Sequence, residues 1–91
     1  MALDNSKKTF DRTVALFKAG SLDEAEEVCR SITNRDPRDI NFLSLLGSIL
    51  LRKDNFEEAE TVLRAVIKLA PEYPRAHEDL GTILLLSLIH I

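Results

Sequence analysis

The sequence predicts an all-α fold built from repeated helix pairs, and three observations support this prediction. The stretch LDEAE at 22–26 returns as FEEAE at 56–60, a displacement of 34 residues. Ala, Leu, Glu, Lys and Arg dominate a composition with only three Gly and three Pro, which favours helices over hairpins. A fixed period of this length is typical of one unit reused in an array. Other landmarks keep the same displacement: Pro37 and Pro71, Gly47 and Gly81, Leu46 and Leu80, Ile49 and Ile83, Leu50 and Leu84.

The first expected helix carries an apolar stripe at Phe10, Val14 and Phe17. This spacing places the three side chains on one helix face, which periodicity alone would bury. Arg12 and Thr13, between them, make poor core residues. Burial of the stripe and exposure of the stripe to a ligand are therefore equally supported.

The second and fourth helices are expected to begin at similar cap sequences. Ser21 with Glu24, and Asn55 with Glu58, have the spacing of a capping box. Carboxylates in a first helical turn are stabilised by the helix dipole, so these acids are interpreted as solvated caps and not as a metal or acid–base cluster. The acids concerned are Asp23, Glu24, Glu26, Glu27, Glu57, Glu58 and Glu60.

The third helix is expected over Arg38 to Arg52, where apolar residues recur with a period of 3.6. Asn41, Ser44 and Ser48 lie on another side of this helix. In the second and fourth helices, Ala25 and Ala59 are expected where two helices approach closely, because a small side chain permits that approach.

Charge and cysteine content exclude several classes of function. A net charge of −3 without a basic block argues against a nucleic-acid surface. One cysteine and an opening without a secretion signal favour a cytoplasmic location. The apolar ending at 83–91 is shorter than the roughly 20 residues of a membrane span, so no membrane contact is expected.

These residues resemble the tetratricopeptide repeat, a 34-residue helix–turn–helix unit. The resemblance implies a right-handed α-solenoid of antiparallel helix pairs with about 2.5 repeats, in units 6–39, 40–73 and a truncated 74–91. The residues that carry it are Leu46, Gly47, Leu50, Phe56, Ala59, Leu63, Val66 and Pro71.

The ending of the chain departs from the repeat pattern. The third unit reaches its first helix and then reads SLIHI where a polar turn is expected. LSLIHI also resembles translated sequencing-adapter sequence, which raises the question whether 87–91 are native. We expect the chain to be the N-terminal part of a longer bacterial protein.

In this family the first helices of successive repeats line a concave groove that holds a peptide or a partner helix. Transfer of those positions predicts a groove that binds a protein or an extended peptide. Phe10, Val14 and Leu45 stand where some members clamp a chaperone's terminal carboxylate, so that clamp is absent. The predicted groove residues are Phe10, Val14, Phe17, Lys18, Asn41, Ser44, Ser48, Leu51, Arg52, Arg75, Glu78 and Thr82.

No catalytic, cofactor or metal motif stands out in the sequence. Cys29 lies on the buried stripe of the second helix and is interpreted as a core residue. His77 and His90 are isolated, and two lone histidines do not make a metal site.

The predicted function is that of a non-enzymatic protein-interaction module. The alternative is a set of repeats that positions the substrate of a larger sulfotransferase or glycosyltransferase, which this array also resembles. A last expectation is self-association through the apolar C-terminal helix, whose ridge from Ile83 to Leu86 would be exposed.

Overall fold

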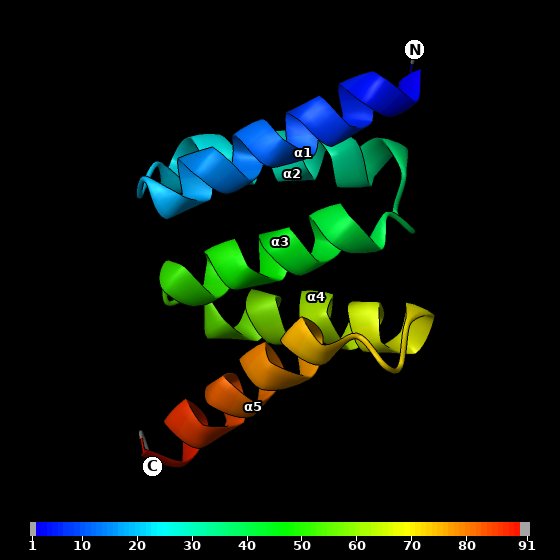
Figure 1. The fold of residues 1–91 in the computed structure, drawn as a ribbon. Helices are drawn as coiled ribbons and strands as arrows, with labels where there is room; N and C mark the ends of the chain where they lie inside the picture. The colour runs from blue at the N-terminus through cyan, green and yellow to red at the C-terminus, as the bar shows by residue number, and fades with distance from the viewer. Residues whose placement is uncertain (1, 90–91) are drawn as a thin grey trace.

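A computed structural model describes residues 2–89 as a stack of helices joined by short turns. The pairs α1/α2 and α3/α4 follow one another, and α1 and α5 lie at opposite ends of the stack (Figure 1). No strand occurs within residues 2–89, so the predicted all-α helical repeat is confirmed. The helices are α1 Ala2–Lys18, α2 Leu22–Arg35, α3 Ile40–Arg52, α4 Phe56–Leu69 and α5 Pro74–Ile89.

The two turns within helix pairs use the same backbone geometry. Gly20 and Asp54 have φ angles of 86° and 62°, in the left-handed region that ends many helices. The next N–H in each turn reaches back to the preceding helix, from Ser21 to the Leu16 carbonyl and from Asn55 to the Leu50 carbonyl, both at 2.9 Å. The repeat in sequence is therefore also a repeat of backbone conformation.

The expected capping boxes are wrong, because neither the Ser21 nor the Asn55 side chain accepts a cap hydrogen bond. The Asn55 side chain instead donates to Glu58 Oε1 at 3.2 Å. Side-chain capping occurs at α3, where Asp39 Oδ1 accepts from the Phe42 N–H at 3.2 Å. Asp39 has the extended backbone typical of an N-cap, so α3 begins at Ile40 and not at Arg38.

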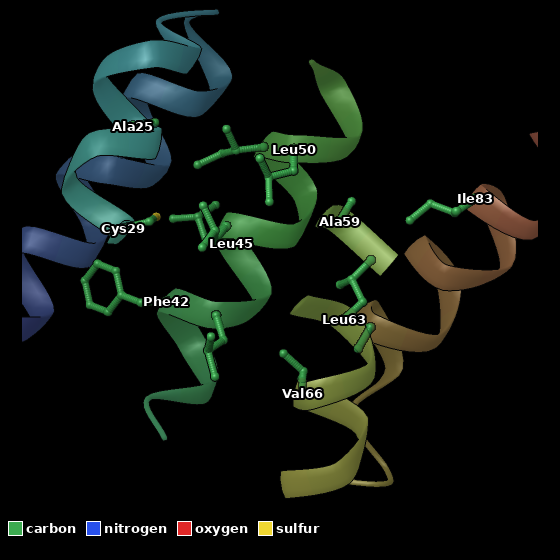
Figure 2. Close-up of a cluster of buried hydrophobic side chains, with 13 residues drawn as sticks. Ala25, Cys29, Phe42, Leu45, Leu50, Ala59, Leu63, Val66 and Ile83 are labelled. Carbon is green, nitrogen blue, oxygen red and sulfur yellow. The ribbon is translucent and has the colours of Figure 1, made fainter. Parts of the chain in front are cut away.

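The hydrophobic core is centred on α3, which lies between α2 and α4. Every residue from Phe42 to Leu50 is buried. Figure 2 shows Leu45 and Leu50 among side chains of α2 on one side, and Ala59, Leu63 and Val66 of α4 on the other. Each neighbouring helix thus covers a different face of α3.

Small residues allow these helices to approach closely. Ala25 and Ala59 are both fully buried, as predicted for contact positions. A Cβ atom on Gly47 would lie 2.5 Å from Leu63 Cδ2 and 2.8 Å from its Cγ. The close contact between α3 and α4 therefore depends on the absence of a side chain at position 47.

Thr13 corrects the expectation that it makes a poor core residue. It is 1% exposed, and its hydroxyl donates to the Thr9 carbonyl at 2.6 Å. Because the hydroxyl is satisfied inside its own helix, the side chain is buried without a lost hydrogen bond. Arg12, beside it, is exposed.

Ion pairs connect the first and second helix pairs. Lys53 contacts Asp23 at 2.6 Å and Glu26 at 2.7 Å, and Arg30 contacts Glu26 and Glu58, both at 2.7 Å. The side chain of Glu26 is mostly covered. These acids are thus more than solvated caps, since their ion pairs join α2 to the turn after α3 and to α4.

The last helix, α5, is covered less completely than α3. The exposed apolar ridge expected from Ile83 to Leu86 does not include Ile83, which is buried. Leu84, Leu85 and Leu88 are 45%, 60% and 70% exposed. Within residues 2–89, no helix has both the length and the apolar composition needed to cross a membrane.

Candidate functional site

A cavity of about 260 Å³ lies between α1, α3 and the start of α5. It lies on the face formed by the first helix of each pair, and the turn before α5 closes one side. The residues that line it are Phe10, Val14, Phe17 and Lys18 of α1, Asn41, Ser44 and Leu45 of α3, Tyr73 of the turn, and Arg75 of α5.

The stripe on α1 both packs on the core and lines the cavity. Phe10, Val14 and Phe17 are partly buried against the core cluster. The ring of Phe10 meets Phe42 edge to face, with centroids 5.3 Å apart and planes at 86°. One edge of the stripe is thus used for folding while another remains available to a ligand, so burial and exposure are not exclusive.

The two predicted groove serines of α3 differ in their surroundings. Ser48 is 4% exposed and donates to Asp79 Oδ2 of α5 at 2.6 Å, so it ties two helices together. Ser44 is 1% exposed, lines the cavity, and its hydroxyl has no hydrogen-bond partner among the described residues. Neither serine is exposed, because packing against α5 covers Ser48 and because Ser44 lies in the cavity wall.

Four other predicted groove residues do not line the cavity. The guanidinium of Arg52 lies over the Phe17 ring, 4.9 Å from its centroid, and so supports the cavity wall. Leu51 packs partly against the core. Glu78 and Thr82 are exposed on α5, where the Thr82 hydroxyl donates to the Glu78 carbonyl at 3.1 Å.

The charge around the cavity differs from that of the chain as a whole. The net charge is −3, yet the described residues that line the cavity include two cations, Lys18 and Arg75, and no carboxylate. A second hollow, between α1 and α2, is lined by Glu24, Glu27 and Arg35 among others. The lining of the cavity thus carries two positive charges and no negative charge, unlike the lining of this second hollow.

Tyr73 was missed as a cavity residue, and Leu45 was considered only as a position where a clamp is absent. Tyr73 belongs to the turn, and its N–H donates to the Ala70 carbonyl at 3.0 Å. Its place before Pro74 was the available signal, because the residue before proline favours an extended backbone and so belongs to the turn and not to the following helix.

The cysteine and histidine side chains outside the cavity are not arranged for catalysis or for metal binding among the described residues. Burial raises the pKa of the Cys29 thiol to about 12, and the charges of Asp39 and Glu26 add to the effect. The thiol is therefore protonated at neutral pH, and thiols react as thiolates. Nε2 of His77 lies 2.5 Å from the Pro71 carbonyl oxygen. His90 lies outside the described residues, among which no group of His, Cys, Asp and Glu could hold a metal.

Comparison with known proteins identifies the repeat. A family model described as tetratricopeptide repeat matches residues 44–87, which cover most of α3, all of α4 and most of α5. No curated protein matches the chain. The matched segment holds the Gly47 contact, the left-handed turn at Asp54 and the buried Ala59, each with the spacing from which the repeat was predicted. Residues 44–87 of this chain therefore belong to the tetratricopeptide-repeat family.

Proposed function

We propose that this chain is a protein-interaction module that binds an extended peptide segment of a partner along the face formed by α1, α3 and α5. Tetratricopeptide repeats in general support interaction and scaffolding. The observation that carries the proposal for this chain is the cavity itself. It combines half-buried apolar side chains with cations and an amide at its edge, the mixture typical of sites that bind a partner's side chain.

Selection from a random peptide library on the immobilised chain tests this proposal. Peptides that bind are then titrated against Asn41→Ala and Arg75→Ala at the cavity, and against Glu27→Ala and Lys68→Ala on second helices. All four side chains are exposed, so the fold is expected to remain intact. A hot-spot truncation costs more than about 1 kcal/mol, which corresponds to a loss of affinity of about fivefold.

We expect at least one of the two cavity variants to lose affinity by this amount while both second-helix variants bind as the original chain does. If the second-helix variants lose affinity and the cavity variants do not, the binding face has been assigned to the wrong side. If no peptide is selected, the chain is not a peptide-binding module.

We also propose that the exposed leucines of α5 pair with the same surface of a second copy. Leu84, Leu85 and Leu88 are exposed on α5, and a two-fold axis would bring this apolar surface against its own copy. Sedimentation velocity should show a dimer that Leu85→Glu dissociates. A monomer at every concentration would contradict this pairing.

The alternative function, a set of repeats that positions the substrate of a larger sulfotransferase or glycosyltransferase, stays a prediction.

A further inference from the structure

The size of the cavity limits what it can hold. Its volume of about 260 Å³ is below the roughly 300–1,000 Å³ of sites that enclose drug-sized molecules. Its apolar wall is formed by Phe10, Val14, Phe17 and Leu45, from two different helices. A concave apolar wall of this size fits one side chain of a partner.

The two cations at the cavity have no ion-pair partner in the part of the chain that the structure describes. Neither Lys18 nor Arg75 forms an ion pair among the described residues, whereas Lys53, Arg30 and Arg64 each do. Arg75 lies in the first turn of α5, where the helix dipole disfavours a positive charge. A contribution to folding stability therefore does not explain the positive charge of Arg75.

Two uncharged polar side chains also lie at the cavity. The amide side chain of Asn41 is exposed beside the cavity, and the hydroxyl of Ser44 lies in its wall without a hydrogen-bond partner among the described residues. An unsatisfied buried hydroxyl carries a cost that a ligand can remove once the side chain turns about its Cα–Cβ bond. Both groups suit the backbone of an extended peptide.

From these observations we infer that the cavity binds an acidic peptide segment of a partner protein, with one apolar side chain inserted between Phe10 and Phe17. Carboxylates of acidic residues that flank this side chain contact Lys18 and Arg75. The inference rests on the proposed function and specifies its ligand. Charge complementarity selects the ligand class, because the cavity lining carries two cations and no carboxylate in a chain with a net charge of −3.

The test uses a peptide capped at both ends, acetyl-Ser-Asp-Phe-Asp-Ser-amide, titrated into isotope-labelled protein and followed by NMR. We expect the largest shifts at the backbone amides of residues that line the cavity. A matched peptide with Ala in place of Phe should bind at least about fivefold more weakly. A peptide with both Asp residues changed to Asn should bind about threefold more weakly or worse, and raised salt should reduce the difference.

Protein variants locate the contact with the carboxylates. Lys18→Gln and Arg75→Gln should each weaken binding of the Asp peptide about threefold and leave binding of the Asn peptide unchanged. Lys68→Gln is the matched control for Lys18→Gln, because both lysines are exposed in the last turn of a helix. It should leave binding of both peptides unchanged.

Three results would overturn the inference. They are equal binding of the Asp and Asn peptides, equal binding of the Phe and Ala peptides, or binding of free phenylacetate as tight as that of the capped peptide, which would indicate a small-molecule site. The peptide-library selection separates this failure from failure of the proposed function. If selected peptides depend on Asn41 or Arg75 but lack an apolar residue flanked by acids, the function stands and this ligand assignment falls.

Discussion

Helices α3 and α5 carry the same repeat positions, 34 residues apart, yet they differ in almost every contact. A Cβ on Gly47 would clash with Leu63, whereas a Cβ on Gly81 would meet nothing within 4 Å. Leu50 is fully buried, and its equivalent Leu84 is 45% exposed. Identical positions in sequence therefore have different physical roles.

The difference between the two helices comes from the number of neighbours that cover them. Helix α3 contacts α1, α2, α4 and α5, whereas α5 contacts α3 and α4. In an array, each unit buries its apolar face only against an adjacent unit. The repeat pattern thus specifies which residues lie on the face that can be buried. The neighbouring helices determine which of those residues are buried in the structure.

The largest expected difference is between truncation of the two leucines. Leu50→Ala should lower the free energy of unfolding by about 2–5 kcal/mol, because it leaves a cavity in the core. Leu84→Ala removes a side chain that is partly solvated within one chain, and at concentrations where the chain is monomeric it should change the free energy of unfolding by less than about 0.5 kcal/mol. Urea denaturation followed by circular dichroism measures both. Equal losses for the two variants would show that α5 is covered as fully as α3.

The two glycines should respond to alanine with opposite signs. Gly47→Ala forces its Cβ against Leu63 Cγ and Cδ2, an overpacking that costs about 1–3 kcal/mol and exceeds the roughly 1 kcal/mol gained in helix propensity. Gly81→Ala gains the propensity without a contact and should stabilise the chain by about 0.5–1 kcal/mol. The shift in denaturation midpoint reports each change. Stabilisation by Gly47→Ala would contradict the close approach of α3 and α4.

A smaller contrast is expected between the two serines of α3. Ser48→Ala removes the hydrogen bond to Asp79 and should cost about 1 kcal/mol, since the carboxylate is partly exposed and regains water. Ser44→Ala removes a hydroxyl that has no partner among the described residues and should leave stability unchanged or slightly raised. Thermal unfolding of the two variants side by side tests this. If Ser44→Ala is the more destabilising of the pair, its hydroxyl has a partner after all.

The smallest expected effect is on the pH dependence of the free energy of unfolding, through the ion pairs that connect the first two helix pairs. Hydrogen bonds and charge from Lys53 lower the pKa of Asp23, contacts with Lys53 and Arg30 lower the pKa of Glu26, and Arg30 lowers that of Glu58. A carboxyl group whose pKa is lower in the folded chain stabilises it above the unfolded pKa, and this contribution is lost as the pH falls through the folded pKa.

Stability should therefore fall below about pH 4, and Lys53→Gln should flatten that fall. Urea denaturation of both chains across this range measures the difference. The same loss in acid for the two chains would mean that these ion pairs contribute nothing to the free energy of unfolding.

The parts of the fold that follow from local pattern were predictable. A period of 3.6 marks the buried faces, and the buried positions of Ala25, Cys29 and Ala59 follow from it. The cavity was partly predictable, because seven of the predicted groove residues, among them Phe17 and Arg75, line it.

The remaining features depend on contacts between elements far apart in the chain. The Ser48 to Asp79 hydrogen bond joins residues 31 apart and exists only because α5 packs on α3 at one particular angle. Burial of Ser44 in the cavity wall and the arrival of Tyr73 at the cavity likewise depend on how the helices pack against one another. A helical period identifies a face but does not specify how far the next helix covers it.

Hydrogen exchange of backbone amides, measured residue by residue by NMR, tests most directly the claim that stacking neighbours determine burial. The amides of Ile49 and Leu50 should exchange only when the whole chain unfolds, and those of Leu84 and Leu85 should exchange through local opening at a lower free energy. Protection of α5 equal to that of α3 would contradict the account.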